Sequence, residues 1–178
     1  MAGGFCRALD GDAEDGMSEL CIRVVPTDPE WQPTAGAAAG TTEYAAGLFA
    51  GPGDHVEAVE PVFYERVTLI DGGEYMQDVF CPRCGAAIGL NWFWDLLTAR
   101  NGGRTVGGPA VCDLGVTVPC CGAALTLPEP RFEAPVGFAR FEVSARNWSR
   151  DVWELGGEEL AAAGAVLGHP VTQVLAHY

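Results

Sequence analysis

Two short cysteine stretches in the sequence have the residue types and spacing to hold one metal ion. The first reads Cys-Pro-Arg-Cys-Gly over residues 81–85, and the second reads Val-Pro-Cys-Cys-Gly over residues 118–122. Aligned on Cys-Gly, both continue with Ala-Ala and an apolar segment, so they form a short internal repeat. Structural zinc takes four ligands at tetrahedral geometry, often all cysteine, and a glycine allows the positive φ of a tight turn. The repeat therefore predicts a zinc site with Cys81, Cys84 and Cys121 as ligands.

The fourth ligand is left open by the sequence. Val118 stands where the alignment expects a partner for Cys81. Cys120, directly beside Cys121, can replace it if the backbone between the two turns sharply, and Pro119 helps to fix such a bend. Cys112 is an alternative, and a three-sulfur site closed by water or another group is a third. The last case would favour catalysis, because an open coordination position distinguishes catalytic from structural zinc.

With these motifs, residues 79–127 resemble a zinc ribbon, also described as rubredoxin-like. The resemblance implies a structural zinc held by four cysteines, and it implies no activity. A redox reading of Cys81 and Cys84 is the competitor, because a CxxC pair can cycle to a disulfide. Redox pairs of this kind normally precede a helix in a thioredoxin-like unit. Here a glycine turn and a strand-like pattern follow instead, which favours metal.

The segments around the cysteine region must position it. Alternating apolar residues predict strands at 21–25, 61–70, 137–146 and 171–178. Helices are expected after Thr34, a good N-cap, and over residues 158–167, where Gly168 and Pro170 mark the end. The resulting order is β-α-β, cysteine region, β-α-β, which is the split βαβ order of a ferredoxin-like α+β fold. The expected division is a disordered tail over 1–16, a first half over 17–78, a zinc-ribbon insertion over 79–127 and a second half over 128–178.

Two groups of residues are candidates for contact with partners. A helix is predicted over 92–100, and its Trp92 and Trp94 either pack within the chain or form part of a protein-binding patch, since aromatic residues concentrate at interface hot spots. Arg140 and Arg146, with Arg150 nearby, either lie on a solvated strand face or form a basic strip.

Charge and missing motifs narrow the function. The 178 residues carry a formal net charge of −14 with a pI of about 4.4, and all ten basic residues are Arg. Such a charge repels phosphate backbones, so nucleic-acid binding is disfavoured and is kept only as an alternative, through the ribbon and the basic strip.

No signal peptide or membrane-length apolar run appears, so a cytoplasmic location is expected. None of the common nucleophile, phosphate-loop or His-Glu zinc motifs is present. We therefore expect a non-enzymatic, zinc-binding protein that acts by binding another protein, with a metal-dependent enzyme as the alternative.

Overall fold

The computed structural model describes residues 18–100, 111 and 113–178. Three predictions concern residues outside the described ranges: the tail over 1–16, the end of the 92–100 helix at Gly102, and Cys112 as a metal ligand. The elements in chain order are β1 (Leu20–Pro26), α1 (Ala35–Gly47), β2 (Ala58–Ile70), β3 (Val79–Phe80), α2 (Leu90–Arg100), β4 (Gly115–Thr117), β5 (Ala124–Thr126), β6 (Arg131–Phe132), β7 (Gly137–Arg146), α3 (Gly157–Leu167) and β8 (Val171–His177).

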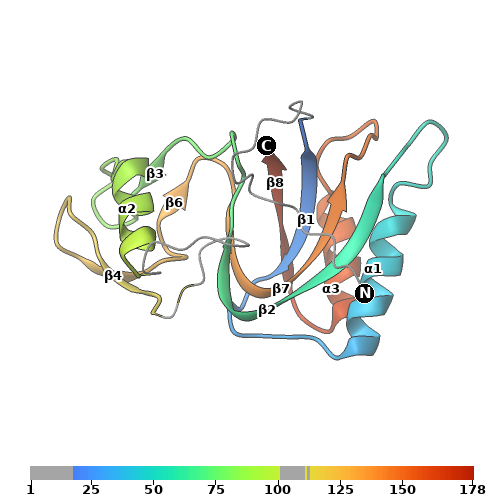
Figure 1. Ribbon diagram of the computed structural model, residues 1–178, viewed down its shortest axis with the longest axis horizontal. Helices are drawn as coiled ribbons and strands as arrows, with labels where there is room; N and C mark the ends of the chain where they lie inside the picture. The colour runs from blue at the N-terminus through green and yellow to red at the C-terminus, as the bar shows by residue number, and fades with distance from the viewer. Residues whose placement is uncertain (1–17, 101–110, 112) are drawn as a thin grey trace.

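The main sheet has four strands in the order β2-β7-β1-β8, and every neighbouring pair is antiparallel. Along the chain, α1 connects β1 to β2 and α3 connects β7 to β8. Each of these helices therefore joins two strands that have another strand between them. Both helices lie against one face of the sheet, and α2 with the short strands lies on the other side (Figure 1). The molecule is a mixed α/β protein with antiparallel sheets, as the sequence predicts.

The helix ends follow the local chemistry of the sequence. Thr34 caps α1, because its hydroxyl accepts a hydrogen bond from the Ala37 N–H at 3.2 Å. Gly168 ends α3 in the left-handed conformation at φ +84°, which an L side chain adopts only with strain. The described helices have 13, 11 and 11 residues. None of the described helices is long and apolar enough to cross a membrane.

Strand β2 differs from its predicted alternation. The sequence predicts that Phe63, Glu65, Val67 and Leu69 share the core face, but Phe63 is 51% exposed and Glu65 is exposed as well. Phe63 pairs with the buried Phe141, and their ring centroids are 4.9 Å apart, but β2 is an edge strand and leaves the Phe63 ring half exposed. The register then breaks: Phe63 pairs with Phe141 and Thr68 pairs with Ala139, so four residues of β2 face one residue of β7. Such a bulge resets which side chains face the core. Residues 67–70 are accordingly all buried.

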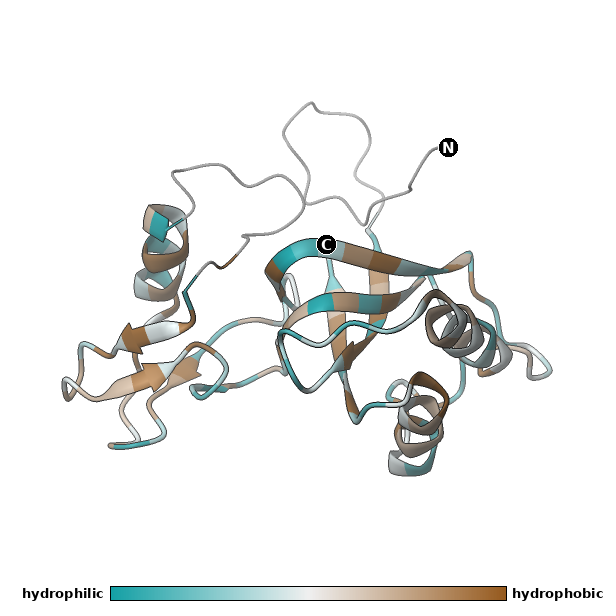
Figure 2. Ribbon diagram, turned by 90° about the horizontal axis from the view of Figure 1, so that it is seen from below, coloured by the Kyte–Doolittle hydropathy of each residue, from teal (hydrophilic) through white to brown (hydrophobic). Residues whose placement is uncertain are grey.

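Among the described residues, two large apolar cores and a small cluster of Val25, Ile70, Ala139 and Val174 hold the structure together. One lies between the sheet and the helices α1 and α3, and Phe141 and Val143 of the central strand β7 are at its centre. The other joins the end of the sheet to the cysteine region, with the fully buried Phe93 of α2 in ring contact with Phe132 and Phe138. Figure 2 shows the main sheet with α1 and α3 beside the cysteine region with α2, and the strands of both parts carry hydrophobic residues. The cysteine region is thus packed on the sheet through α2 and β6.

Candidate metal centre

The first cysteine stretch forms a tight knuckle after β3. The Gly85 N–H donates to the Cys81 carbonyl at 2.9 Å, and the Cys81 N–H donates to the Ala86 carbonyl at 2.9 Å. Gly85 has φ +73°, so the turn needs a residue that tolerates the left-handed region. This closed turn places Cys81 and Cys84 on the same side of the loop.

The second stretch repeats this backbone geometry after β4. The Gly122 N–H donates to the Val118 carbonyl at 3.0 Å, the Val118 N–H donates to the Ala123 carbonyl at 3.0 Å, and Gly122 has φ +71°. Val118 therefore occupies the backbone position that Cys81 occupies in the first knuckle, and it is completely buried. In the same register Cys121 corresponds to Cys84, and Cys120 corresponds to Arg83.

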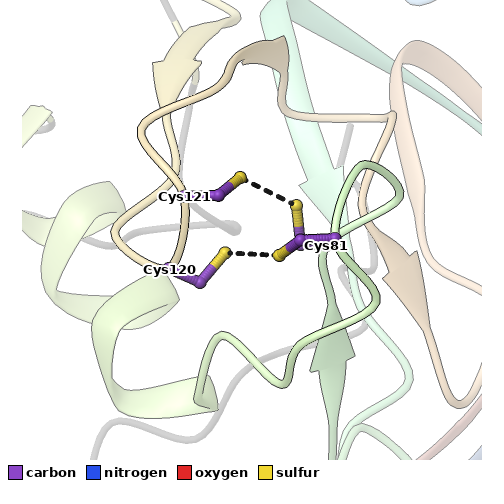
Figure 3. A group of neighbouring side chains, drawn as sticks. Cys81, Cys120 and Cys121 are labelled. Carbon is purple, nitrogen blue, oxygen red and sulfur yellow. Dashed lines mark hydrogen bonds between the residues drawn. The ribbon is translucent and has the colours of Figure 1, made fainter.

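The structure brings four of the predicted ligands together. The sulfur atoms of Cys81, Cys84, Cys120 and Cys121 all lie within 4.8 Å of one another. The Cys81–Cys121 sulfur distance is 3.8 Å and the Cys84–Cys120 distance is 3.5 Å. Four sulfurs at about 2.3 Å from one metal, at tetrahedral angles, are about 3.8 Å apart. Figure 3 shows the sulfurs of Cys81, Cys120 and Cys121 pointing toward a common centre. The group could therefore hold a metal ion.

The pKa values of the Cys81 and Cys120 thiols shift in opposite directions. Hydrogen bonds from the backbone N–H groups of Cys84 and Arg83 lower the pKa of Cys81 to about 7, although burial opposes them. Loss of hydration raises the pKa of Cys120 to about 12, and its contacts with Cys84 and Cys81 add to the rise. Cys120 is exposed, and its sulfur points toward the sulfur of Cys84, 3.5 Å away. Without a cation, four thiolates at this spacing repel one another, and a bound metal ion removes that penalty.

The knuckles sit at the edge of the second core. Cys81 is buried, whereas Cys84, Cys120 and Cys121 are exposed. Cys81 belongs to the same buried cluster as Ile88, Leu125 and Leu127, which follow the two knuckles in the chain. A metal at this centre would thus be reached from solvent on one side and supported by apolar packing on the other.

The predicted partner-binding residues already make contacts within the chain. Trp92 and Trp94 are partly buried and pack against the second core, so much of their surface is used within the chain. Each arginine of the predicted basic strip faces a carboxylate. The contacts are Arg140 to Glu30 at 3.8 Å, Arg146 to Glu60 at 3.7 Å and to Glu19 at 4.0 Å, and Arg150 to Glu159 at 2.8 Å. Their charge is therefore largely balanced by carboxylates of the chain itself.

A second polar constellation was not predicted from the sequence. The Ser18 hydroxyl contacts the Nε2 atom of His177, and the Nδ1 atom of His177 lies 2.9 Å from the Glu74 carboxylate. This is the order of a nucleophile, a base and an orienting acid. Glu74 has a side chain that is 71% exposed, and water weakens the bond that would orient the base. The three residues are far apart in the chain, so no local motif signals them. Pairing of β1 with β8 brings Ser18 to His177, and the Glu74 N–H, which donates to the His177 carbonyl at 2.9 Å, brings in Glu74.

No protein-family model matches the chain, and neither a curated protein nor a solved structure matches it.

Proposed function

We propose that this chain binds one structural zinc ion through Cys81, Cys84, Cys120 and Cys121, in a ribbon-like pair of knuckles inserted into a ferredoxin-like domain. The supporting observation is the set of four sulfurs within 4.8 Å of one another. Four thiolates complete the tetrahedral shell of zinc and leave no position for a substrate. The strand order and the two βαβ halves support the ferredoxin-like assignment.

Metal analysis tests the first part of this proposal. A tetrathiolate site accepts zinc or iron, so the purified protein is expected to carry one zinc per chain and to lack the visible absorption of an iron tetrathiolate. Because binding free energy of a structural metal is folding free energy, stripping the metal should lower the melting temperature. A metal-free protein with an unchanged melt would contradict the structural role.

The biological role that we propose is binding to another protein rather than catalysis. A closed four-sulfur shell supports this role, because it removes the open metal position that the enzymatic alternative needs. The carboxylate contacts of Arg140, Arg146 and Arg150 argue against a nucleic-acid surface. The test is retention of a specific protein from a lysate of the source cells by the immobilised metal-loaded chain. Failure to retain any protein would refute it.

Hydrolysis by Ser18 is the second candidate function, favoured only by its contact with His177 and Glu74. A fluorophosphonate probe labels serines that a neighbouring base activates. Labelling that disappears in Ser18→Ala and falls in His177→Gln would support an enzyme. Absence of labelling in the intact protein would remove this candidate.

A further inference from the structure

The loop between β7 and α3, residues 147–156, exposes two adjacent apolar side chains. Val152 is 60% exposed and Trp153 is 55% exposed. Only two other large hydrophobic residues in the described ranges, Phe63 and Val166, are exposed, and they lie on β2 and α3. Exposed tryptophan is costly in water and is enriched at protein interfaces. This 147–156 loop is therefore the place on the described surface where exposed apolar groups adjoin in sequence.

The beginning of the loop is tied to the main sheet. Asn147 has φ +46°, and no other described residue except glycine has a positive φ. Its N–H donates to the Leu20 carbonyl at 2.7 Å, and its side-chain oxygen accepts from the Leu20 N–H at 3.1 Å. Ser149 and His55 exchange two backbone hydrogen bonds, at 2.9 and 2.8 Å. Asparagine tolerates the left-handed conformation better than most residues, and these contacts hold it there.

The end of the loop is also tied. The Leu155 N–H donates to the Gln173 side chain at 2.8 Å, and the Gln173 amide donates to the Leu155 carbonyl at 3.0 Å. Trp153 packs edge-on against the buried Trp148, with ring centroids 5.3 Å apart. Val152 and Trp153 thus lie between two segments of the loop that are held by hydrogen bonds, one at Asn147 and Ser149 and the other at Leu155. A surface that is already ordered loses less entropy on binding, and so binds more tightly for the same contacts.

The charge around Val152 and Trp153 is negative. Asp151, Glu154 and Glu158 are exposed and make no ion pair with any residue that the structure describes. The one base of the loop, Arg150, is held by Glu159 at 2.8 Å. The whole chain carries a net charge of −14. This surface therefore attracts Lys and Arg, and it repels a phosphate backbone or a second copy of the same acidic chain.

We propose that the 147–156 loop is the docking site for a basic polypeptide segment, which packs an apolar side chain against Trp153 and places Lys or Arg next to Asp151 and Glu154. The inference rests on the proposed protein-binding function and names the surface that carries it. The exposed aromatic ring supplies the affinity, since hot spots are rich in tryptophan. The carboxylates supply orientation and a fast, salt-sensitive association.

A displayed library of random 15-residue peptides is the probe for this site. Selection on the immobilised, metal-loaded protein is expected to enrich peptides with an apolar residue flanked by Lys or Arg. Trp153→Ala should weaken the selected peptides at least ten-fold, and Asp151→Asn with Glu154→Gln should weaken them most at low salt. Phe63→Ala is the matched control, because Phe63 is an aromatic residue of similar exposure, 51%, in a different place; it should leave binding unchanged. Equal melting temperatures show that each variant is folded.

Four results would overturn the inference. The first two are a selection that enriches no peptides and one that enriches peptides without basic residues. The third is a Trp153→Ala variant that binds the selected peptides as tightly as wild type. The fourth is self-association of the wild-type chain that Trp153→Ala abolishes. The lysate experiment separates this inference from the proposed function. If wild type and Trp153→Ala retain the same protein, the protein-binding role stands and the docking site is wrong. If wild type retains nothing, both are wrong.

Discussion

Moving the fourth sulfur ligand by two residues should be possible without loss of metal. In the second knuckle, Val118 has the backbone hydrogen bonds of Cys81, and Cys120 stands where the first knuckle has Arg83. The double substitution Val118→Cys with Cys120→Arg turns the second stretch into a copy of the first, Cys-Pro-Arg-Cys-Gly. Valine and cysteine are of similar size, so the buried position accepts the change. The single substitution Cys120→Arg, which removes a ligand without supplying another, is the matched control.

The size of the effect follows from the four-sulfur geometry. The free energy of zinc binding at structural sites in small peptides is about 10–16 kcal/mol. If the four ligands contribute equally, removing one weakens zinc affinity roughly a hundred-fold or more. Cys120→Arg is therefore expected to bind zinc about a hundred-fold more weakly than wild type. The double variant should recover most of that loss, because its new thiol starts from the position of Cys81 in the pseudo-repeat.

Competition with a chromophoric chelator of known zinc affinity measures both changes, and circular dichroism of each zinc-loaded variant checks folding. Equal affinity of Cys120→Arg and wild type would mean that Cys120 is not a ligand. A double variant that binds no better than Cys120→Arg would refute the argument that Val118 and Cys81 are equivalent positions.

Other outcomes follow from packing and from the titration of two carboxyl groups, Glu142 and Glu159. Phe93→Ala should destabilise the protein by about 3–5 kcal/mol in urea unfolding, since Phe93 is fully buried among aromatic rings; a loss under 1 kcal/mol would show that the second core is not cooperative with the sheet. Burial raises the pKa of Glu142 despite the nearby Arg23, so its contribution to stability is present at low pH and is lost as pH rises through the raised value. Glu142→Gln should therefore gain stability relative to wild type between acid and neutral pH, and a constant difference across that range would contradict this. The pKa of Glu159 shifts in the opposite direction. Burial acts to raise this pKa, but the hydrogen bonds from Arg150 and from the Gly156 N–H outweigh burial and lower it. Glu159→Gln should be less stable than wild type at neutral pH, and the difference should vanish as pH falls through the lowered value; a difference that persists in acid would argue against the ion pair.

The sequence contains enough local information to place most of the elements. Thr34 and Gly168 mark helix ends through their own side-chain and backbone chemistry, and the structure confirms both. The repeated Cys-Gly turns identify the region in which four cysteines lie together. These signals act over a few residues, so a pattern in the chain is sufficient to detect them.

Features that depend on pairing between distant segments were not predictable in this way. The bulge of β2 arises from its register with β7, and it ends the alternation that places Phe63 and Leu69 on one face of the strand. Whether the Cys120 sulfur joins the other three depends on how the second knuckle closes, which the letters Val-Pro-Cys-Cys-Gly leave open. The contact of Ser18 with His177 requires the pairing of the first and last strands of the sheet.

X-ray absorption at the zinc edge of the metal-loaded protein distinguishes a closed four-sulfur site from an open one. We expect four sulfur neighbours at about 2.3 Å, contributed by Cys81, Cys84, Cys120 and Cys121, and loss of one sulfur in Cys120→Arg. Three sulfurs with one nitrogen or oxygen in the wild-type protein would contradict a closed structural site and would favour metal-dependent catalysis.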